Sequence, residues 1–238
     1  MITIKHKKTT IDDVITIYSD IQRHFGKVLA STKTDYKDLN ENKDTRIVTF
    51  KFIIESVQTN IILLHLVKEN FGELKLWDNH QFETGEQRNA FINDRLYFIL
   101  GDLRENLFIN TFLRFESFMK IVALSLDITG ERINTVCKRV IEKLNLNPDC
   151  NNLIDLFTYS RNTMHSEGFH TRDNLKITYK ENSFELRKNE PLLFYDLDFL
   201  AFMIIEIGNL MSDIINNKEI VEKEILEHTY ANITFEYE

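Results

Sequence analysis

The chain has 238 residues, of which 43% are hydrophobic and 28% charged, so it has the composition of a soluble globular protein with a substantial core. Its net charge of −8 argues against a general nucleic-acid binder. Cys137 and Cys150 have no metal-ligand spacing and form no disulfide framework, and the N-terminus has no signal peptide. We therefore expect a cytoplasmic protein without a cofactor.

Long helices are the natural expectation, because only seven glycines and two prolines interrupt the chain. Apolar residues recur at helical spacing in six segments, and Thr10 is placed to cap the first of them. We predict these helices at about residues 10–30, 45–70, 86–126, 130–146, 151–167 and 195–217. Gly101 is a candidate break in the third. The most apolar runs are interrupted by His65 and Glu206 and fall short of a membrane span, so we expect no membrane partner.

Residues 174–188 have a different pattern, in which apolar and polar side chains alternate around Glu181 and Asn182. This pattern predicts a β-hairpin that buries one face, and we expect it to be a dispensable lid or edge. The terminal segments 2–6 and 231–238 also alternate, and we predict that they pair as strands. The sequence thus predicts an all-α fold. It is a bundle of six or seven helices in a single domain, 1–238, with a small β-hairpin inserted before the last long helix.

The chemistry is concentrated in residues 159–170, which read YSRNTMHSEGFH. On a helical wheel the predicted core stripe of this helix consists of Leu153, Phe157, Ser160 and Met164. Arg161 and His165 are four residues apart, so they are neighbours on the flank of that stripe, whereas Asn162 points away. Residues 130–180 carry eight basic and six acidic residues, so this segment is +2 and the rest of the chain is −10.

An arginine beside a histidine supplies what metal-independent RNA cleavage requires. The guanidinium of Arg161 can neutralise the scissile phosphate. The imidazole of His165 can move a proton near neutral pH, and its place in the last helical turn favours the protonated form.

The arrangement of Arg161, its polar follower Asn162 and His165 near the end of a late helix resembles the HEPN superfamily. The resemblance covers about residues 105–216, including the hairpin and the last long helix. It implies a HEPN-like core within the domain, and a homodimer that places two Arg/His pairs across one cleft. Active members cut RNA without metal and commonly serve in toxin–antitoxin, abortive-infection (phage defence) or RNA-processing systems.

By this resemblance Arg161, Asn162 and His165 are the candidate catalytic residues, and the implied partners are RNA, a second copy of the chain, and an antitoxin or other protein. Three residues separate Arg161 from His165, which is fewer than is usual in the family, and His170 would give eight, which is more. The predicted function is a metal-independent endoribonuclease in a bacterial defence or toxin–antitoxin context. The alternative is a non-catalytic helical interaction module that keeps a HEPN-like scaffold.

Structural roles compete with each catalytic assignment. Arg161 is also suited to an ion pair between helices, His165 to a helix-end cap, and Asn162 to a local hydrogen bond. Glu116 and Lys120 are expected to form a surface ion pair, with the orientation of Arg161 as a second role for Glu116.

A metal site is the remaining alternative in this stretch. His165, Glu167 and His170 are conceivable ligands, but neither a cysteine cluster nor an HExxH pattern accompanies them, and one loop rarely supplies a complete site. We therefore expect no metal.

Overall fold

The computed structural model describes residues 10–71, 77, 80–166 and 168–228. Within this part the chain forms seven helices and a two-stranded antiparallel hairpin that precedes α6, which confirms the predicted helical bundle. The elements are α1 (Ile11–Asp35), α2 (Thr45–Asn70), α3 (Gly85–Ser125), α4 (Ile133–Lys143), α5 (Cys150–His165), β1 (Leu175–Tyr179), β2 (Asn182–Leu186), α6 (Leu197–Ile215) and α7 (Lys218–Val221).

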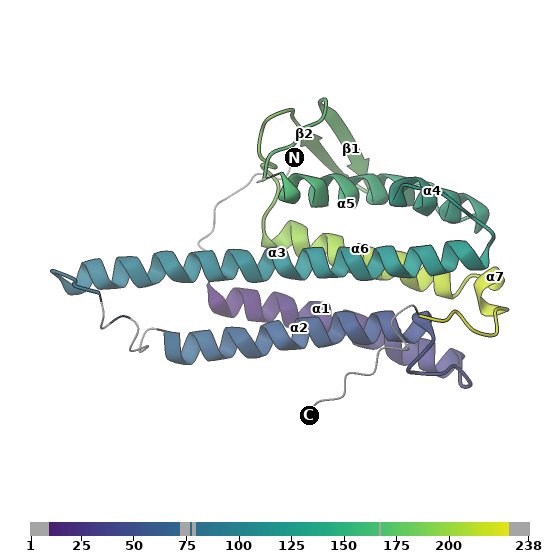
Figure 1. Ribbon diagram of the computed structural model, residues 1–238, viewed down its shortest axis with the longest axis horizontal. Coiled ribbons are helices and arrows are strands. Elements are labelled where there is room, and N and C mark those ends of the chain that lie inside the picture. Colours follow the sequence, from purple (N-terminus) through teal and green to yellow (C-terminus); the bar gives the residue numbers. More distant parts are fainter. Residues whose placement is uncertain (1–9, 72–76, 78–79, 167, 229–238) are drawn as a thin grey trace.

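The long helix α3 crosses the whole molecule, and the other helices are arranged in layers around it (Figure 1). On one side α2 packs against α3 and α1, while α4 and α5 pack on the other side. The helix α6 contacts α1, α3 and α5, and the hairpin covers α5. The first half of α3 and the end of α2 project beyond the rest of the bundle in Figure 1. This positions α5 on the packed second half of α3.

Side-chain caps account for where the three longest helices begin. Thr10 caps the start of α1, as expected from the sequence, and it forms a capping box with Asp13. Asp44 and Thr84 accept backbone N–H groups at the starts of α2 and α3. The helix α3 continues through Gly101, so the candidate break is wrong. A lone helical glycine costs about 1 kcal/mol relative to alanine, which the packing of a 41-residue helix readily offsets.

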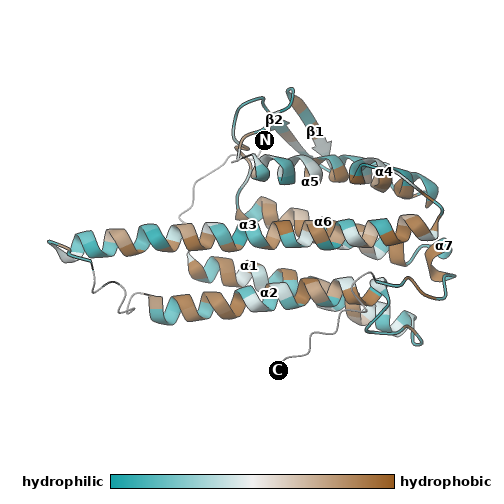
Figure 2. Cartoon of the chain, in the orientation of Figure 1, coloured by the Kyte–Doolittle hydropathy of each residue, from teal (hydrophilic) through white to brown (hydrophobic). Residues whose placement is uncertain are grey.

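The helix α6 is largely buried and consists mostly of hydrophobic residues (Figure 2). It approaches α1 closely at Gly208, where an added Cβ would lie 2.9 Å from Cζ of Phe25. Any larger residue at this position would force the ring of Phe25 to shift, so glycine allows the two helices to pack at this distance.

The hairpin belongs to the core. Strands β1 and β2 pair with Ile177 opposite Phe184, and the inner-face residues Ile177, Tyr179, Phe184 and Leu186 are all at most 5% exposed. The Tyr179 hydroxyl donates a hydrogen bond of 2.8 Å to the carboxylate of Glu206 on α6. The predicted single buried face is confirmed, but this burial contradicts the expectation of a mere lid, since removing the hairpin would expose part of the core.

A buried ion pair ties the C-terminal segment to the start of α2. Asp44 and Arg46 have fully buried side chains, and Arg46 Nη2 lies 2.7 Å from Asp44 Oδ2. The Arg46 guanidinium also donates to three backbone carbonyls after α6, those of Ile220, Lys223 and Glu224. Asp44 in turn accepts the N–H of Leu226. Neither this clamp nor the short helix α7 is predicted by the sequence.

Two expectations from the sequence stay predictions. The pairing of the terminal segments 2–6 and 231–238 falls outside the described residues. The helix α2 is long and apolar enough to cross a membrane on those criteria alone, but core helices of soluble proteins pass the same test.

Candidate functional site

The helix α5 is centred on α3 by one buried aromatic residue. The ring of Phe157 lies 4.9 Å from that of Phe108 and 5.0 Å from that of Phe112. The helix ends at His165, two residues earlier than predicted. Gly168 adopts φ +86° and donates its N–H to the Thr163 carbonyl at 2.9 Å, a helix-ending geometry that favours glycine. The last turn of α5 is therefore held in a defined position above α3.

Arg161 lies against the aromatic surface of α3. Its Cζ is 5.4 Å from the centroid of the Phe112 ring, and its Nε is buried without a hydrogen-bond partner. Within the described part of the chain, no carboxylate forms an ion pair with Arg161. The interhelical ion pair considered as an alternative is therefore not formed by these residues.

His165 is exposed and lies one helical turn after Arg161. Its ring makes no hydrogen bond to the residues that the structure describes. The side chain of Asn162 does not point away as the helical wheel suggests, because its Oδ1 accepts a hydrogen bond of 3.2 Å from Arg161 Nη1. The arrangement leaves an exposed imidazole one helical turn from a guanidinium that has no ion pair among the described residues.

The other residues near the motif have structural partners. Glu116 forms the expected pair with Lys120 at 2.7 Å and makes no ion pair with Arg161. His170 is buried, and its Nε2 is hydrogen-bonded to the Asp173 carbonyl at 3.1 Å. The backbone N–H of His170 donates to the Glu190 carbonyl, which joins the loop after α5 to the exit of the hairpin. His170 is therefore a structural residue.

A metal centre gains no support from this geometry. Among the described residues, no group of three histidine, cysteine, aspartate or glutamate side chains is placed to hold an ion. Glu167, the second conceivable ligand, lies outside the described residues.

A second arginine near the end of α5 is absent from the sequence prediction. Arg104 on α3 places its Cζ 5.5 Å from the ring centroid of Tyr195, and its Nε is also buried without a hydrogen bond. The Tyr195 hydroxyl donates to Sδ of Met164 at 3.7 Å, and Met164 directly precedes His165. One feature of the sequence could have indicated that Arg104 faces the protein. It lies four residues before Phe108, and therefore on the same side of the helix as the apolar stripe. Only the tertiary structure brings it towards α5.

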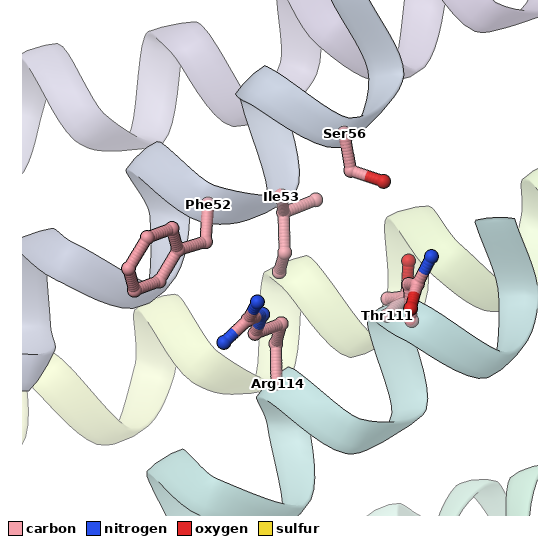
Figure 3. A pocket seen from close by; sticks show the side chains of 6 residues that line it. Phe52, Ile53, Ser56, Thr111 and Arg114 are labelled. Atoms are coloured by element: carbon pink, nitrogen blue, oxygen red, sulfur yellow. The ribbon is translucent and has the colours of Figure 1, made fainter. Parts of the chain in front are cut away.

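A small cavity lies on the other side of α3, where this helix faces α2 (Figure 3). It is lined by Phe52, Ile53, Ser56, Asn110, Thr111 and Arg114. The Arg114 guanidinium lies 4.4 Å from the centroid of the Phe52 ring. The volume is ≈ 110 Å³, well below the roughly 300 Å³ at which small-molecule sites begin. This cavity is separate from the face of α3 that carries α5, and we assign it no function.

Comparisons with protein-family models, curated proteins and solved structures find no match to this chain. A function is therefore proposed from the chain's own residues.

Proposed function

We propose that this protein is a HEPN-like, metal-independent endoribonuclease that acts in the cytoplasm, in a bacterial defence or toxin–antitoxin context. One observation carries the proposal. Arg161 and His165 lie in successive turns of α5, with the imidazole exposed and the guanidinium held on Phe112 without a carboxylate partner among the described residues. Arginine that is held in place with free donors is suited to bind a phosphate in two-pronged geometry.

The reaction proposed is transfer of the phosphoryl group within the RNA. The 2′-oxygen attacks the adjacent phosphorus, the bond from phosphorus to the 5′-oxygen breaks, and a 2′,3′-cyclic phosphate and a 5′-hydroxyl result. His165 takes the proton of the 2′-hydroxyl or gives one to the leaving 5′-oxygen. Arg161 stabilises the charge that develops on the phosphoryl oxygens. Asn162 orients Arg161 through its hydrogen bond.

A dimer would supply the second proton-transfer group. In the proposed arrangement two copies of α5 face one another, so that one His165 acts as base and the other as acid. The loops beside α5 offer exposed apolar side chains for such a contact, since Phe169 is 47% and Leu193 63% exposed. Light scattering at micromolar concentration is expected to give twice the mass of the chain, and a strict monomer would count against the shared site.

The test is RNA cleavage in the presence of EDTA. The wild-type protein is expected to cut RNA and leave a 2′,3′-cyclic phosphate. His165→Ala and Arg161→Ala should each lower the rate by about 10²–10³-fold or more, as for loss of a group that stabilises a transition state. The matched controls are His65→Ala, which removes an exposed helical histidine elsewhere, and Arg172→Ala, which removes an exposed arginine stacked on Tyr159. Activity that EDTA abolishes, or that survives in the double variant of Arg161 and His165, contradicts the proposal.

A non-catalytic interaction module is the second candidate, and the projecting part of the bundle favours it. There α2 exposes Ile62 and Leu66, and α3 exposes Tyr97 and Phe98, all by more than 50%. Such side chains are typical of protein contact surfaces when they occur together. If substitution of Tyr97 and Phe98 by serine abolishes the biological effect of the protein while changes at Arg161 and His165 do not, this second candidate is preferred.

A further inference from the structure

Arg104 is partly buried, yet no acidic residue in the described part of the chain pairs with it. It is partly buried on α3, with its guanidinium over the ring of Tyr195 and its Nε enclosed but unbonded. It forms no ion pair with any residue that the structure describes. A partly desolvated arginine without an acidic partner is costly to keep, so an external anion is the natural counterpart.

The hydroxyl of Tyr18 gives a second, independent indication at the same place. Tyr18 on α1 is completely buried, and its hydroxyl has no hydrogen-bond partner. Burial raises the pKa of Tyr18, and the charge of nearby Arg104 opposes that rise. Burial likewise raises the pKa of Tyr195, again opposed by Arg104. An unsatisfied buried hydroxyl is unfavourable, and native structures keep few of them. The unsatisfied Tyr18 hydroxyl and the unbonded Nε of Arg104 together indicate a place where a ligand or water completes the hydrogen bonding.

Tyr195 connects Arg104 to the end of α5. Its ring lies under Arg104, and its hydroxyl is bonded to Met164, the residue before His165. Arg161 is anchored on Phe112, which follows Arg104 on α3 by two turns, or about 12 Å of helix axis. The two guanidinium groups thus lie on two different aromatic rings, and the ring that carries Arg104 also contacts the last turn of α5 through Met164.

We propose that Arg104 is a second phosphate-binding residue, which holds a backbone phosphate of single-stranded RNA while Arg161 holds the phosphate at which cleavage takes place. The identity of the ligand as RNA rests on the proposed function. The two arginines lie on different rings, Tyr195 and Phe112, so each is assigned a phosphate of its own along one RNA strand. Stacking on Tyr195 fixes the guanidinium before the RNA arrives, which reduces the entropy lost on binding.

Acidic residues near Arg104 must also be considered. Glu105 is close enough to Tyr195 to raise the pKa of that hydroxyl, but it forms no ion pair with Arg104 in the described part of the chain. A carboxylate there repels a phosphate. Glu105→Gln is therefore expected to tighten RNA binding, the opposite sign to a change at Arg104.

The experiment measures binding apart from cleavage. Fluorescence anisotropy is recorded with a labelled 2′-O-methyl oligoribonucleotide, which keeps the phosphates but has no 2′-hydroxyl to attack. Arg104→Ala should weaken binding about tenfold and reduce the slope of log Kd against log salt by about 0.7, as for loss of one phosphate contact to a single strand. Arg104→Lys should recover part of the affinity, because it restores the charge but not the planar fork.

Two variants control for loss of charge alone. Arg95→Ala removes an arginine from the same helix that is stacked on Phe91 and Phe98, and Arg172→Ala removes one stacked on Tyr159. Both should bind within about twofold of wild type, since neither arginine is assigned a phosphate in the proposed arrangement. Thermal midpoints confirm that each variant is folded.

The outcomes distinguish RNA binding by Arg104 from RNA cleavage by Arg161 and His165. Loss of binding in Arg104→Ala but not in Arg95→Ala supports it, even if unmodified RNA is never cut and the proposed function fails. Equal binding by Arg104→Ala and wild type overturns it, even if cleavage through His165 is demonstrated. Absence of binding by the wild-type protein, or full competition by inorganic phosphate at the concentration of the oligonucleotide, also overturns it.

Discussion

Arg46 and Arg161 show two opposite ways of placing an arginine in this bundle. The guanidinium of Arg46 is completely buried, and its donors are used by Asp44 and by backbone carbonyls of the C-terminal segment. Arg161 has an aromatic ring beneath it, one neighbouring amide, and no carboxylate partner in the described part of the chain. The first arrangement uses the arginine to join distant segments, whereas the second leaves donors that no carboxylate of the described residues occupies. The contrast predicts that substitutions at Arg46 act on stability and those at Arg161 on function.

The largest effect is expected at Arg46. Arg46→Ala leaves the buried carboxylate of Asp44 without its cation and frees the carbonyls after α6, so the free energy of unfolding should fall by about 3–5 kcal/mol. Urea unfolding followed by circular dichroism measures this. Arg23→Ala is the matched control, since its pair with Asp20 is largely exposed and should contribute less than about 1 kcal/mol. If Arg46→Ala lowers the free energy of unfolding no more than Arg23→Ala does, Arg46 does not have the structural role assigned to it.

The difference between the two arginines also shows what the sequence was able to predict. Helical spacing of apolar residues depends on local geometry, so the six long helices and the hairpin were predicted with boundaries close to those observed. Asp44 and Arg46 have no distinguishing pattern in the sequence, because the backbone groups that they bind besides each other lie more than 170 residues further along the chain. A contact of that sequence separation has no local signal.

The same reasoning applies to the candidate site. The juxtaposition of Arg161 and His165 follows from helix periodicity alone, and the sequence predicted it. The ring of Phe112 beneath Arg161, the bond from Asn162, and the place of Arg104 beside Tyr195 depend on how α3 and α5 pack and on which rotamers result. The sequence did not predict these features, because residue spacing alone does not determine side-chain direction or tertiary packing.

An effect on stability between those at Arg46 and Arg161 is expected for the hydrogen bond that Tyr179 donates to the buried carboxylate of Glu206. Tyr179→Phe removes the donor to Glu206 and should lower the free energy of unfolding by about 1.5–3 kcal/mol, the range for bonds to charged groups. Tyr97→Phe is the control, because Tyr97 is 71% exposed and its substitution should be neutral. If the two variants unfold at the same urea concentration, the hairpin is not anchored through Glu206.

His228, close to the Arg46 clamp, gives a pH-dependent effect that we expect to be smaller. Burial, and then the charge of Arg114, lower the pKa of His228 below its ordinary value of 6.5. The unfolded chain therefore binds a proton at a higher pH than the folded protein, so stability is fully present above pH 6.5 and falls as the pH is lowered through that value. His228→Gln should flatten this fall between about pH 7 and pH 5, the range in which histidine titrates. Urea midpoints measured across that range for both proteins test this, and parallel curves would show that His228 is not responsible.

The smallest effect on stability is expected at Arg161, and it decides whether the comparison holds. An exposed or partly exposed cation–π contact contributes about 0.5–1 kcal/mol, so Arg161→Ala should lower the free energy of unfolding by no more than that. Phe112 is 3% exposed and packs on Phe157, so Phe112→Leu has a packing cost of its own. The double variant separates the two contributions. Each single variant loses the interaction between guanidinium and ring, and the double variant loses it once, so the difference between the sum of the single losses and the double loss measures that interaction. A coupling of about 0.5–1 kcal/mol would show that Phe112 holds Arg161 in place without making it structural. A loss at Arg161 as large as that at Arg46 would mean that the chain itself uses its donors, and the phosphate-binding role would then have no basis.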